Sequence, residues 1–266
     1  MTKLAVTIGS LLFIVSALDD RWFEFDLNFS LSSSLVFVLC MLLVPLNWKL
    51  EAIKWKVLLK QFSTYENNAL ESVMKGLALN WLMPFSTGDI VARLSNSGNV
   101  VKTGKALLIG RTVSLTVTVG FGLIGIGTYL IRSDMTSIRV EYIYLGSVVV
   151  LGVLLLMEVV RKVSLITILR YLIFATQFTL LIKVFNPGLS VELIFRGVTW
   201  VLFIRTIVPG FLGAIGIREA SALIFFQPLI THSSTILAPS LVIWILNMVL
   251  PSLLGFWFVW RSKNGI

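Results

Sequence analysis

Several polar side chains that could bind an anion stand within strongly apolar stretches of this sequence. The candidate substrate-binding residues are Asn80, Arg93, Arg111, Arg205, Arg218 and Glu219. The guanidinium of arginine binds phosphate through a planar fork and stays charged when water is removed. Charged residues at membrane depth are costly and commonly mark a binding site or a transport path. We therefore expect the four arginines to bind an anionic group, with phosphate as the first candidate.

Two acidic residues, Asp89 and Glu219, stand next to these arginines in the sequence. Our first interpretation is that they neutralise Arg93 and Arg218 in structural ion pairs. The alternative hypothesis is that they take up protons and couple transport to a proton gradient.

Catalysis by a triad or by a metal cluster has little support in the sequence. The chain has one histidine, His232, in a short polar turn, and one cysteine, Cys40, in an apolar run. A single cysteine excludes an internal disulfide and a thiolate metal cluster. We predict no catalytic residue, no metal site and no cofactor.

Two segments with matching spacing interrupt the apolar runs, 125 residues apart. Residues 84–93 read PFSTGDIVAR and residues 209–219 read PGFLGAIGIRE, so both contain P-x-x-x-G-x-x-x-x-R. Proline removes a hydrogen-bond donor and glycine loosens the backbone, so each segment should break a helix. The predicted backbone and hinge positions are Pro84, Gly88, Asp89, Pro209, Gly210, Gly213 and Gly216. Paired interruptions in two halves of a membrane protein indicate a transporter's binding site.

The composition identifies the class of protein. Hydrophobic residues make up 57% and charged residues 13% of the 266 residues, whereas soluble domains carry about 25% charged residues. We predict an all-α polytopic membrane protein with a single transmembrane domain over residues 1–266. The net charge of +9 is not gathered into a basic, aromatic-rich polar run, so no nucleic-acid partner is expected.

The apolar runs predict about six transmembrane helices and two re-entrant helical hairpins. The predicted spans are residues 4–18, 31–47, 105–131, 142–160, 164–184 and 236–260. With a cytoplasmic N-terminus, twelve basic residues lie inside and three outside, in agreement with the positive-inside rule. The hairpins then enter from opposite faces, so 31–131 and 142–260 form an inverted repeat. The alternative is that each hairpin crosses fully, which gives eight or more helices.

Residues 48–60 alternate lysines with tryptophan and leucine after the second predicted span. Trp48 and Trp55 are seven residues apart and would share one helix face. We therefore predict an amphipathic helix at the membrane interface, with Lys49, Lys54, Lys56 and Lys60 directed toward the headgroups.

Three motifs between about residues 47 and 225 also carry a family resemblance. They read P-x-x-x-G-x-x-G-x-R-E, L-x-P-x-x-x-G-D-x-x-x-R and K-W-x-x-L-L. The matching residues are Pro209, Gly213, Gly216, Arg218 and Glu219; Leu82, Pro84, Gly88, Asp89 and Arg93; and Lys54, Trp55, Leu58 and Leu59. This set resembles the flippase-like membrane domain of lysylphosphatidylglycerol synthases and their stand-alone relatives. Ala214 and Lys54 depart from the family's usual glycine and arginine.

The resemblance implies movement of a lipid across a membrane, which we expect to be the cytoplasmic membrane of a prokaryote. The distribution of basic residues favours a cytoplasmic location for both termini. The resemblance implies no lysyl transfer, because it covers only the membrane domain. The expected partners are membrane lipids, either an anionic phospholipid or a polyprenyl-phosphate-linked lipid. A second copy of the chain and a partner enzyme remain open as protein partners.

Two alternatives to a lipid translocase remain open at the level of sequence. One is a membrane transferase that uses a lipid-linked donor, with Glu24 and Asp26 as a metal site or a base in an outer loop. The other is a non-catalytic membrane subunit. Glu24→Gln separates the enzyme from the translocase, because only the enzyme needs that carboxylate.

Overall fold

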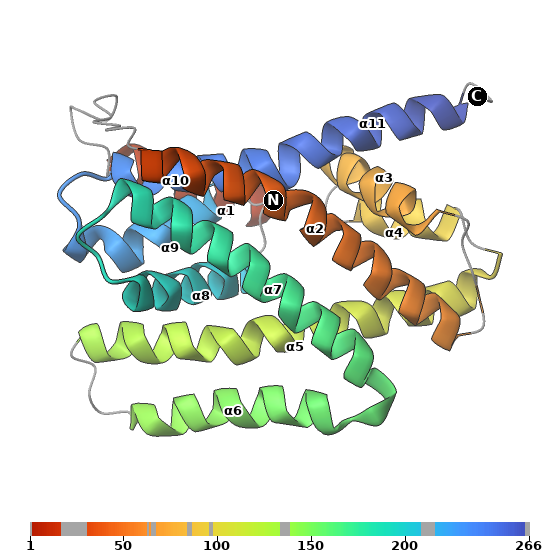
Figure 1. The fold of residues 1–266 in the computed structure, drawn as a ribbon, viewed down its shortest axis with the longest axis horizontal. Coiled ribbons are helices and arrows are strands. Elements are labelled where there is room, and N and C mark those ends of the chain that lie inside the picture. The colour runs from red at the N-terminus through yellow and green to blue at the C-terminus, as the bar shows by residue number, and fades with distance from the viewer. Residues whose placement is uncertain are drawn as a thin grey trace.

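The computed structural model of the chain describes residues 2–16, 31–62, 64, 68–83, 87–95, 98–133, 139–208 and 216–263. Its regular elements in these ranges are all helices, which confirms the predicted all-α class (Figure 1). They are α1 Thr2–Ser16, α2 Leu31–Gln61, α3 Ala69–Leu82, α4 Thr87–Ser95, α5 Val100–Arg132, α6 Val140–Leu156, α7 Glu158–Phe185, α8 Val191–Ile207, α9 Ile217–Phe226, η3 Gln227–Leu229, α10 Ser234–Trp244, η4 Ile245–Val249 and α11 Leu250–Lys263.

Four helical stretches are long and apolar enough to cross a bilayer. They are Ser33–Gln61, Val100–Arg132, Val160–Phe185 and Ser234–Arg261. The last joins α10, the π-helical turn η4 and α11 into one continuous stretch. Two further apolar helices, Thr7–Ser16 and Val140–Leu156, are shorter. The described part of the chain therefore has the helices of an integral membrane protein.

The two Pro/Gly motifs fall between pairs of packed helices. The first motif separates α3 from α4, which pack together, and the second separates α8 from α9, which also pack together. In Figure 1 the α3–α4 pair and the α8–α9 pair lie at opposite ends of the long axis. Pro84, Pro209, Gly210 and Gly213 lie outside the described residues, so the predicted hinges there remain predictions.

The arrangement of helices repeats with the same 125-residue shift as the motifs. The shift superimposes the range of α2 on α7 and that of α3 on α8, and it brings α4 and α5 into partial overlap with α9 and with the α10–α11 stretch. The packing follows the same relation, because α3 packs on α11 whereas its counterpart α8 packs on α5. The central pair, α2 and α7, lies side by side and runs in opposite directions (Figure 1).

Glycines allow close backbone approach at these equivalent crossings. A Cβ on Gly255 of α11 would lie 2.0 Å from the carbonyl oxygen of Met74 on α3. A Cβ on Gly125 of α5 would lie 2.4 Å from the backbone nitrogen of Trp200 on α8. Gly88, a predicted hinge position, has the same role within the first hairpin, because a Cβ there would lie 2.2 Å from the carbonyl carbon of Leu79. Small residues let membrane helices pack this closely.

Residues 48–60 are helical as predicted, but they are not a separate interfacial helix, and Lys54 is buried rather than directed toward headgroups. These residues continue α2 without a break, and Trp55 and Lys54 are 1% and 5% exposed. Trp55, Leu58 and Leu59 pack in a core cluster with residues of α5 and α7. Only Lys49, Lys56 and Lys60 keep the predicted exposure. The alternation of lysines with tryptophan and leucine suggested an interfacial helix, but the apolar face of this segment packs against other helices of the protein.

The boundary between the fourth and fifth predicted spans also differs. The break between α6 and α7 falls at Met157, and Arg161 and Lys162 already belong to α7. Met157 is extended, with φ −72° and ψ 101°, and Glu158 stands in the first turn of α7, where a carboxylate stabilises a helix N-terminus.

Candidate functional site

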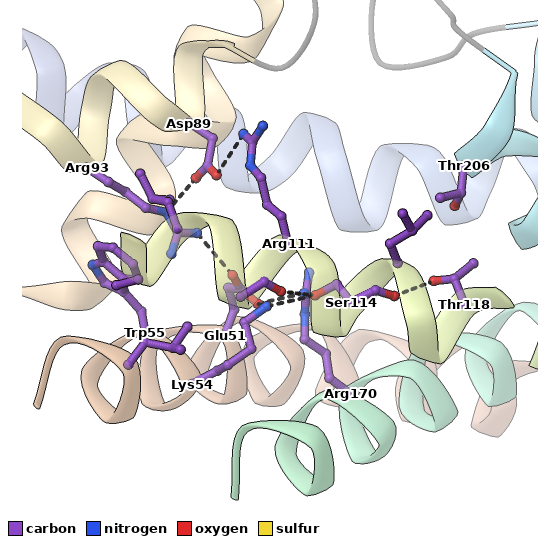
Figure 2. Close-up of a pocket in the computed structure, with 15 residues that line it drawn as sticks. Glu51, Lys54, Trp55, Asp89, Arg93, Arg111, Ser114, Thr118, Arg170 and Thr206 are labelled. Carbon is purple, nitrogen blue, oxygen red and sulfur yellow. Dashed lines mark hydrogen bonds and ion pairs between the residues drawn. The ribbon is translucent and has the colours of Figure 1, made fainter. Parts of the chain in front are cut away.

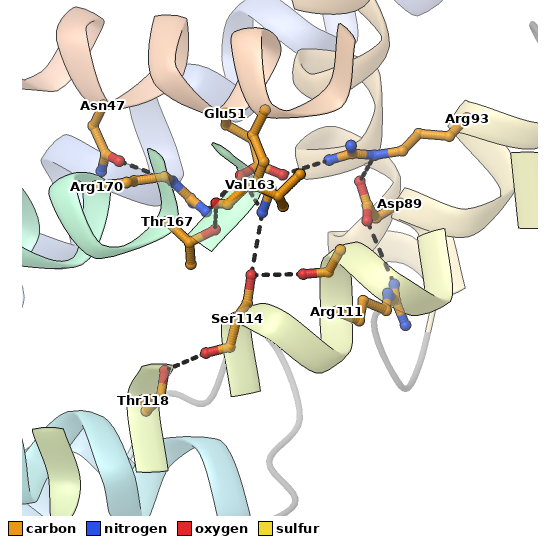
Figure 3. A network of polar contacts seen from close by, with 12 residues as sticks. Asn47, Glu51, Asp89, Arg93, Arg111, Ser114, Thr118, Val163, Thr167 and Arg170 are labelled. Atoms are coloured by element: carbon orange, nitrogen blue, oxygen red, sulfur yellow. Dashed lines mark hydrogen bonds and ion pairs between the residues drawn. The ribbon is translucent and has the colours of Figure 1, made fainter. Parts of the chain in front are cut away.

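Glu51 on α2 is the centre of a buried charge network. Its Oε2 lies 2.7 Å from Lys54 Nζ and 2.6 Å from Arg170 Nη1, and its Oε1 accepts a hydrogen bond from Arg93 Nη2 at 3.0 Å (Figure 3). Lys54 reaches Glu51 because residues three apart share a helix face. Arg93 comes from α4 and Arg170 from α7, so one carboxylate joins three helices.

Asp89 is the second carboxylate of the network. Arg93 Nε donates to Asp89 Oδ1 at 2.7 Å, which is the ion pair expected from the sequence, and Arg111 Nη2 lies 3.4 Å from Asp89 Oδ2. The backbone N–H of Asp89 donates to Asn80 Oδ1 at 2.9 Å. The predicted residues Asn80, Arg93 and Arg111 therefore meet around Asp89, from α3, α4 and α5.

A pocket of about 300 Å³ opens beside this network (Figure 2). Its ionisable lining residues are Glu51, Lys54, Asp89, Arg93, Arg111 and Arg170. Four are cationic and two anionic, so the formal charge of the lining is +2. The hydroxyl-bearing residues Ser114, Thr118 and Thr206 also line the pocket, and Trp55 and leucines supply its apolar wall.

The four cations differ in their access to solvent. The side chains of Lys54 and Arg93 are each 6% exposed, whereas those of Arg111 and Arg170 are 41% and 37% exposed. The Arg93 guanidinium also lies over the Trp55 ring, 4.6 Å from its centroid. Arg93 and Lys54 are thus enclosed by the protein, and Arg111 and Arg170 offer their charge to an incoming group.

A chain of amides extends the network toward the last helical stretch. Arg170 Nε donates to Asn47 Oδ1 at 2.9 Å, and Asn47 Nδ2 donates to Asn247 Oδ1 at 3.2 Å. Asn247 Nδ2 lies 3.4 Å from the side-chain oxygen of Gln177. Asn247 belongs to the π-helical turn η4, a feature frequent at functional sites.

The second motif forms a smaller cluster at the start of α9. Arg218 is 3% exposed and its Nε donates to Glu219 Oε1 at 3.0 Å, which is the second ion pair expected from the sequence. Glu219 Oε2 accepts from the backbone N–H of Gly216 at 3.0 Å and so caps the helix. Gly216 has φ +87°, a conformation that favours glycine, which explains this predicted backbone position.

Arg205 lies between the two groups of charges. It is half-buried near the end of α8, and no hydrogen bond or ion pair joins it to another residue of the described ranges. The charges that act on it most strongly are those of Arg218, Glu219 and Arg170. The predicted residues therefore fall into a pocket group and an α9 group, with Arg205 within electrostatic range of both.

Three ionisable residues of the pocket were not among the predicted site residues: Glu51, Lys54 and Arg170. Glu51 is the only acidic residue between positions 31 and 62, and Arg170 stands alone in an apolar run. The cost of an isolated charge in an apolar run, applied as it was to Arg111, would have identified Arg170, whereas Glu51 stands among lysines and gives no such signal.

Two residues of the transferase alternative cannot be placed. Glu24 and Asp26 lie outside the described residues.

Comparison of the chain with models of known protein families, with curated protein sequences and with solved structures gives no match.

Proposed function

We propose that the chain is a lipid translocase that moves an anionic lipid headgroup across the bilayer. The observation that carries this proposal is a pocket with a formal charge of +2 inside a scaffold of span-length apolar helices. Arginine at membrane depth is retained where it binds a substrate or lines its path. The headgroup would enter the pocket while the acyl chains stay in the bilayer.

The place of the pocket supports movement as well as binding. Glu51, Asp89 and Arg111 come from the first half of the chain, whereas Arg170 and Thr206 come from the second half. In transporters built from inverted repeats, the substrate site lies where the two halves meet. Rocking of one half against the other would expose the pocket to one face of the membrane and then to the other.

We further propose the membrane topology of six crossings and two re-entrant hairpins that enter from opposite faces. The opposite ends occupied by α3–α4 and α8–α9 support it (Figure 1). Lys54 and Arg93 are buried and are left out of the count of basic residues on each side of the membrane. Ten of the others then lie on the predicted cytoplasmic side and three on the outer side, so the excess that the positive-inside rule requires remains. Cysteines at Ser95 and Ser190 should be labelled from opposite faces, and labelling from one face would contradict this topology.

Lipid movement in proteoliposomes tests the proposed function. Phosphatidate, phosphatidylglycerol and polyprenyl phosphate, each radiolabelled in its phosphate, would be reconstituted with the wild type, with Arg111→Gln plus Arg170→Gln, and with Lys105→Gln plus Arg161→Gln. The control pair removes the same two charges from α5 and α7 at exposed positions outside the pocket. We expect movement of at least one lipid by the wild type and the control, and a loss of about a hundredfold in the pocket variant, because two charge-assisted contacts disappear.

Two results would contradict the translocase. One is no movement of any lipid by folded wild-type protein. The other is movement that the pocket variant leaves unchanged. If Glu24→Gln abolishes a lipid-dependent activity that the pocket variant retains, the transferase becomes the better account.

A further inference from the structure

We propose that the translocated headgroup ends in a phosphomonoester, and that Arg111 and Arg170 together bind this phosphate. This inference rests on the proposed function and names its substrate class. It follows from the charge balance of the pocket, from the unequal exposure of its four cations, and from the absence of an equivalent charge set in the second half.

The charge balance indicates how much negative charge the ligand brings. Two carboxylates face four cations in the pocket, which leaves a formal charge of +2 in its lining. A phosphodiester carries one negative charge, whereas a phosphomonoester carries about 1.5 to 2 near neutral pH. A bound monoester therefore neutralises the pocket, whereas a diester leaves an excess positive charge in a site partly closed to water. Such an excess is unfavourable there.

The contacts indicate which cations meet the phosphate. Arg93 is enclosed and fully engaged by Glu51, Asp89 and the ring of Trp55. Lys54 is enclosed between Glu51 and Ser114 Oγ, which lies 3.2 Å from its Nζ. Arg111 and Arg170 are the more exposed cations and lie on α5 and α7, two helices that pack together. Figure 2 shows both guanidinium groups at the pocket.

The second half of the chain has no equivalent of this site. The α10–α11 stretch, which corresponds to α5, carries no charged residue before Arg261, so Arg111 has no counterpart. Helix α7, which corresponds to α2, carries no acidic residue after Glu158, so Glu51 has no counterpart. The repeat is thus symmetric in its helices but not in its charges. One phosphate would bind per chain.

Binding in detergent tests the substrate class separately from movement. Affinities for wild-type protein would be measured with dioleoyl phosphatidate, a monoester, and dioleoyl phosphatidylglycerol, a diester with the same acyl chains. Inorganic phosphate and glycerol 3-phosphate serve as competitors that lack acyl chains. We expect phosphatidate to bind at least about tenfold more tightly than phosphatidylglycerol, because of its additional charge. We expect the soluble phosphates to compete only weakly.

Variants separate the role of these arginines from a structural one. Arg111→Gln and Arg170→Gln should each weaken phosphatidate binding by about tenfold to a hundredfold and reduce its advantage over phosphatidylglycerol. Arg111→Lys and Arg170→Lys keep the charge but lose the planar fork, so they should recover part of the affinity. Lys105→Gln and Arg161→Gln are the matched controls. Thermal unfolding of each variant shows that a loss of binding is not a loss of fold.

Each outcome decides the inference. Equal binding of the two lipids would overturn the monoester class, even if lipid movement is observed. Displacement of phosphatidate by an equal concentration of inorganic phosphate would overturn a lipid source for the phosphate. Selective phosphatidate binding that depends on Arg111 and Arg170 would support the inference even if no lipid moves, so its failure and the failure of translocation are distinguishable.

Discussion

Replacing Glu51 by glutamine is expected to lower the free energy of unfolding by about 3–5 kcal/mol. Glu51 is buried, and its carboxylate pairs with Lys54, Arg93 and Arg170. Glutamine keeps the shape of the side chain but removes the negative charge that three cations from α2, α4 and α7 share. The measurement is equilibrium unfolding in mixed micelles, followed by tryptophan fluorescence.

Two variants show whether the loss comes from uncompensated positive charge. Glu192→Gln breaks the more exposed pair with Arg196 and should change stability by less than about 1 kcal/mol. Glu51→Gln combined with Lys54→Met removes one of the cations left unneutralised and should recover part of the lost stability. Glu51→Gln with wild-type stability would contradict the central role of this carboxylate.

Replacing Arg93 by glutamine should have the second-largest effect, again about 3–5 kcal/mol. Arg93 is 5% exposed and bridges Glu51 of α2 and Asp89 of its own helix, with its guanidinium over the Trp55 ring. Its loss leaves two carboxylates with fewer partners and detaches α4 from α2. The same unfolding measurement detects it.

Arg218→Gln is the matched comparison for Arg93→Gln. Arg218 occupies the same place in the second motif and is equally buried, but its ion-pair partner is its sequence neighbour Glu219. Glu219 also keeps its hydrogen bond from the Gly216 N–H. The loss should therefore be smaller, about 1–3 kcal/mol. If Arg218→Gln costs as much as Arg93→Gln, the bridge from α4 to α2 does not explain the effect.

The helices and the two hairpins could be predicted because their signals are local. Apolar runs predicted where the long helices lie, although α2 continues to Gln61, beyond the predicted end at residue 47. The repeated P-x-x-x-G spacing fell where two packed helices meet in both halves. The pair of Asp89 and Arg93 was also predictable, since residues four apart share a helix face.

The contacts of Glu51 could not be predicted from local sequence in the same way, because its partners are distant in the sequence. Arg170 reaches Glu51 across 119 residues and Arg93 reaches it across 42. In isolation, the lysines and tryptophans of residues 48–60 are typical of an interfacial helix. The burial of Lys54 and Trp55 depends on α4, α5 and α7, which supply neighbouring charges and packing. Ion pairs of this kind become visible only when the helices are assembled.

The central claim, that a lipid headgroup occupies the pocket, is tested most directly by protection of a cysteine placed in it. Thr118 lines the pocket outside the charge network, and Cys40, the only native cysteine, is buried and can be replaced by serine. Alkylation of Thr118→Cys would be compared in liposomes with and without phosphatidate, with Ser133→Cys at the exposed end of α5 as the control. We predict that phosphatidate slows alkylation at position 118 by about tenfold or more, as expected for a bound headgroup, and leaves position 133 unchanged. Equal rates at position 118 with and without phosphatidate would contradict the account.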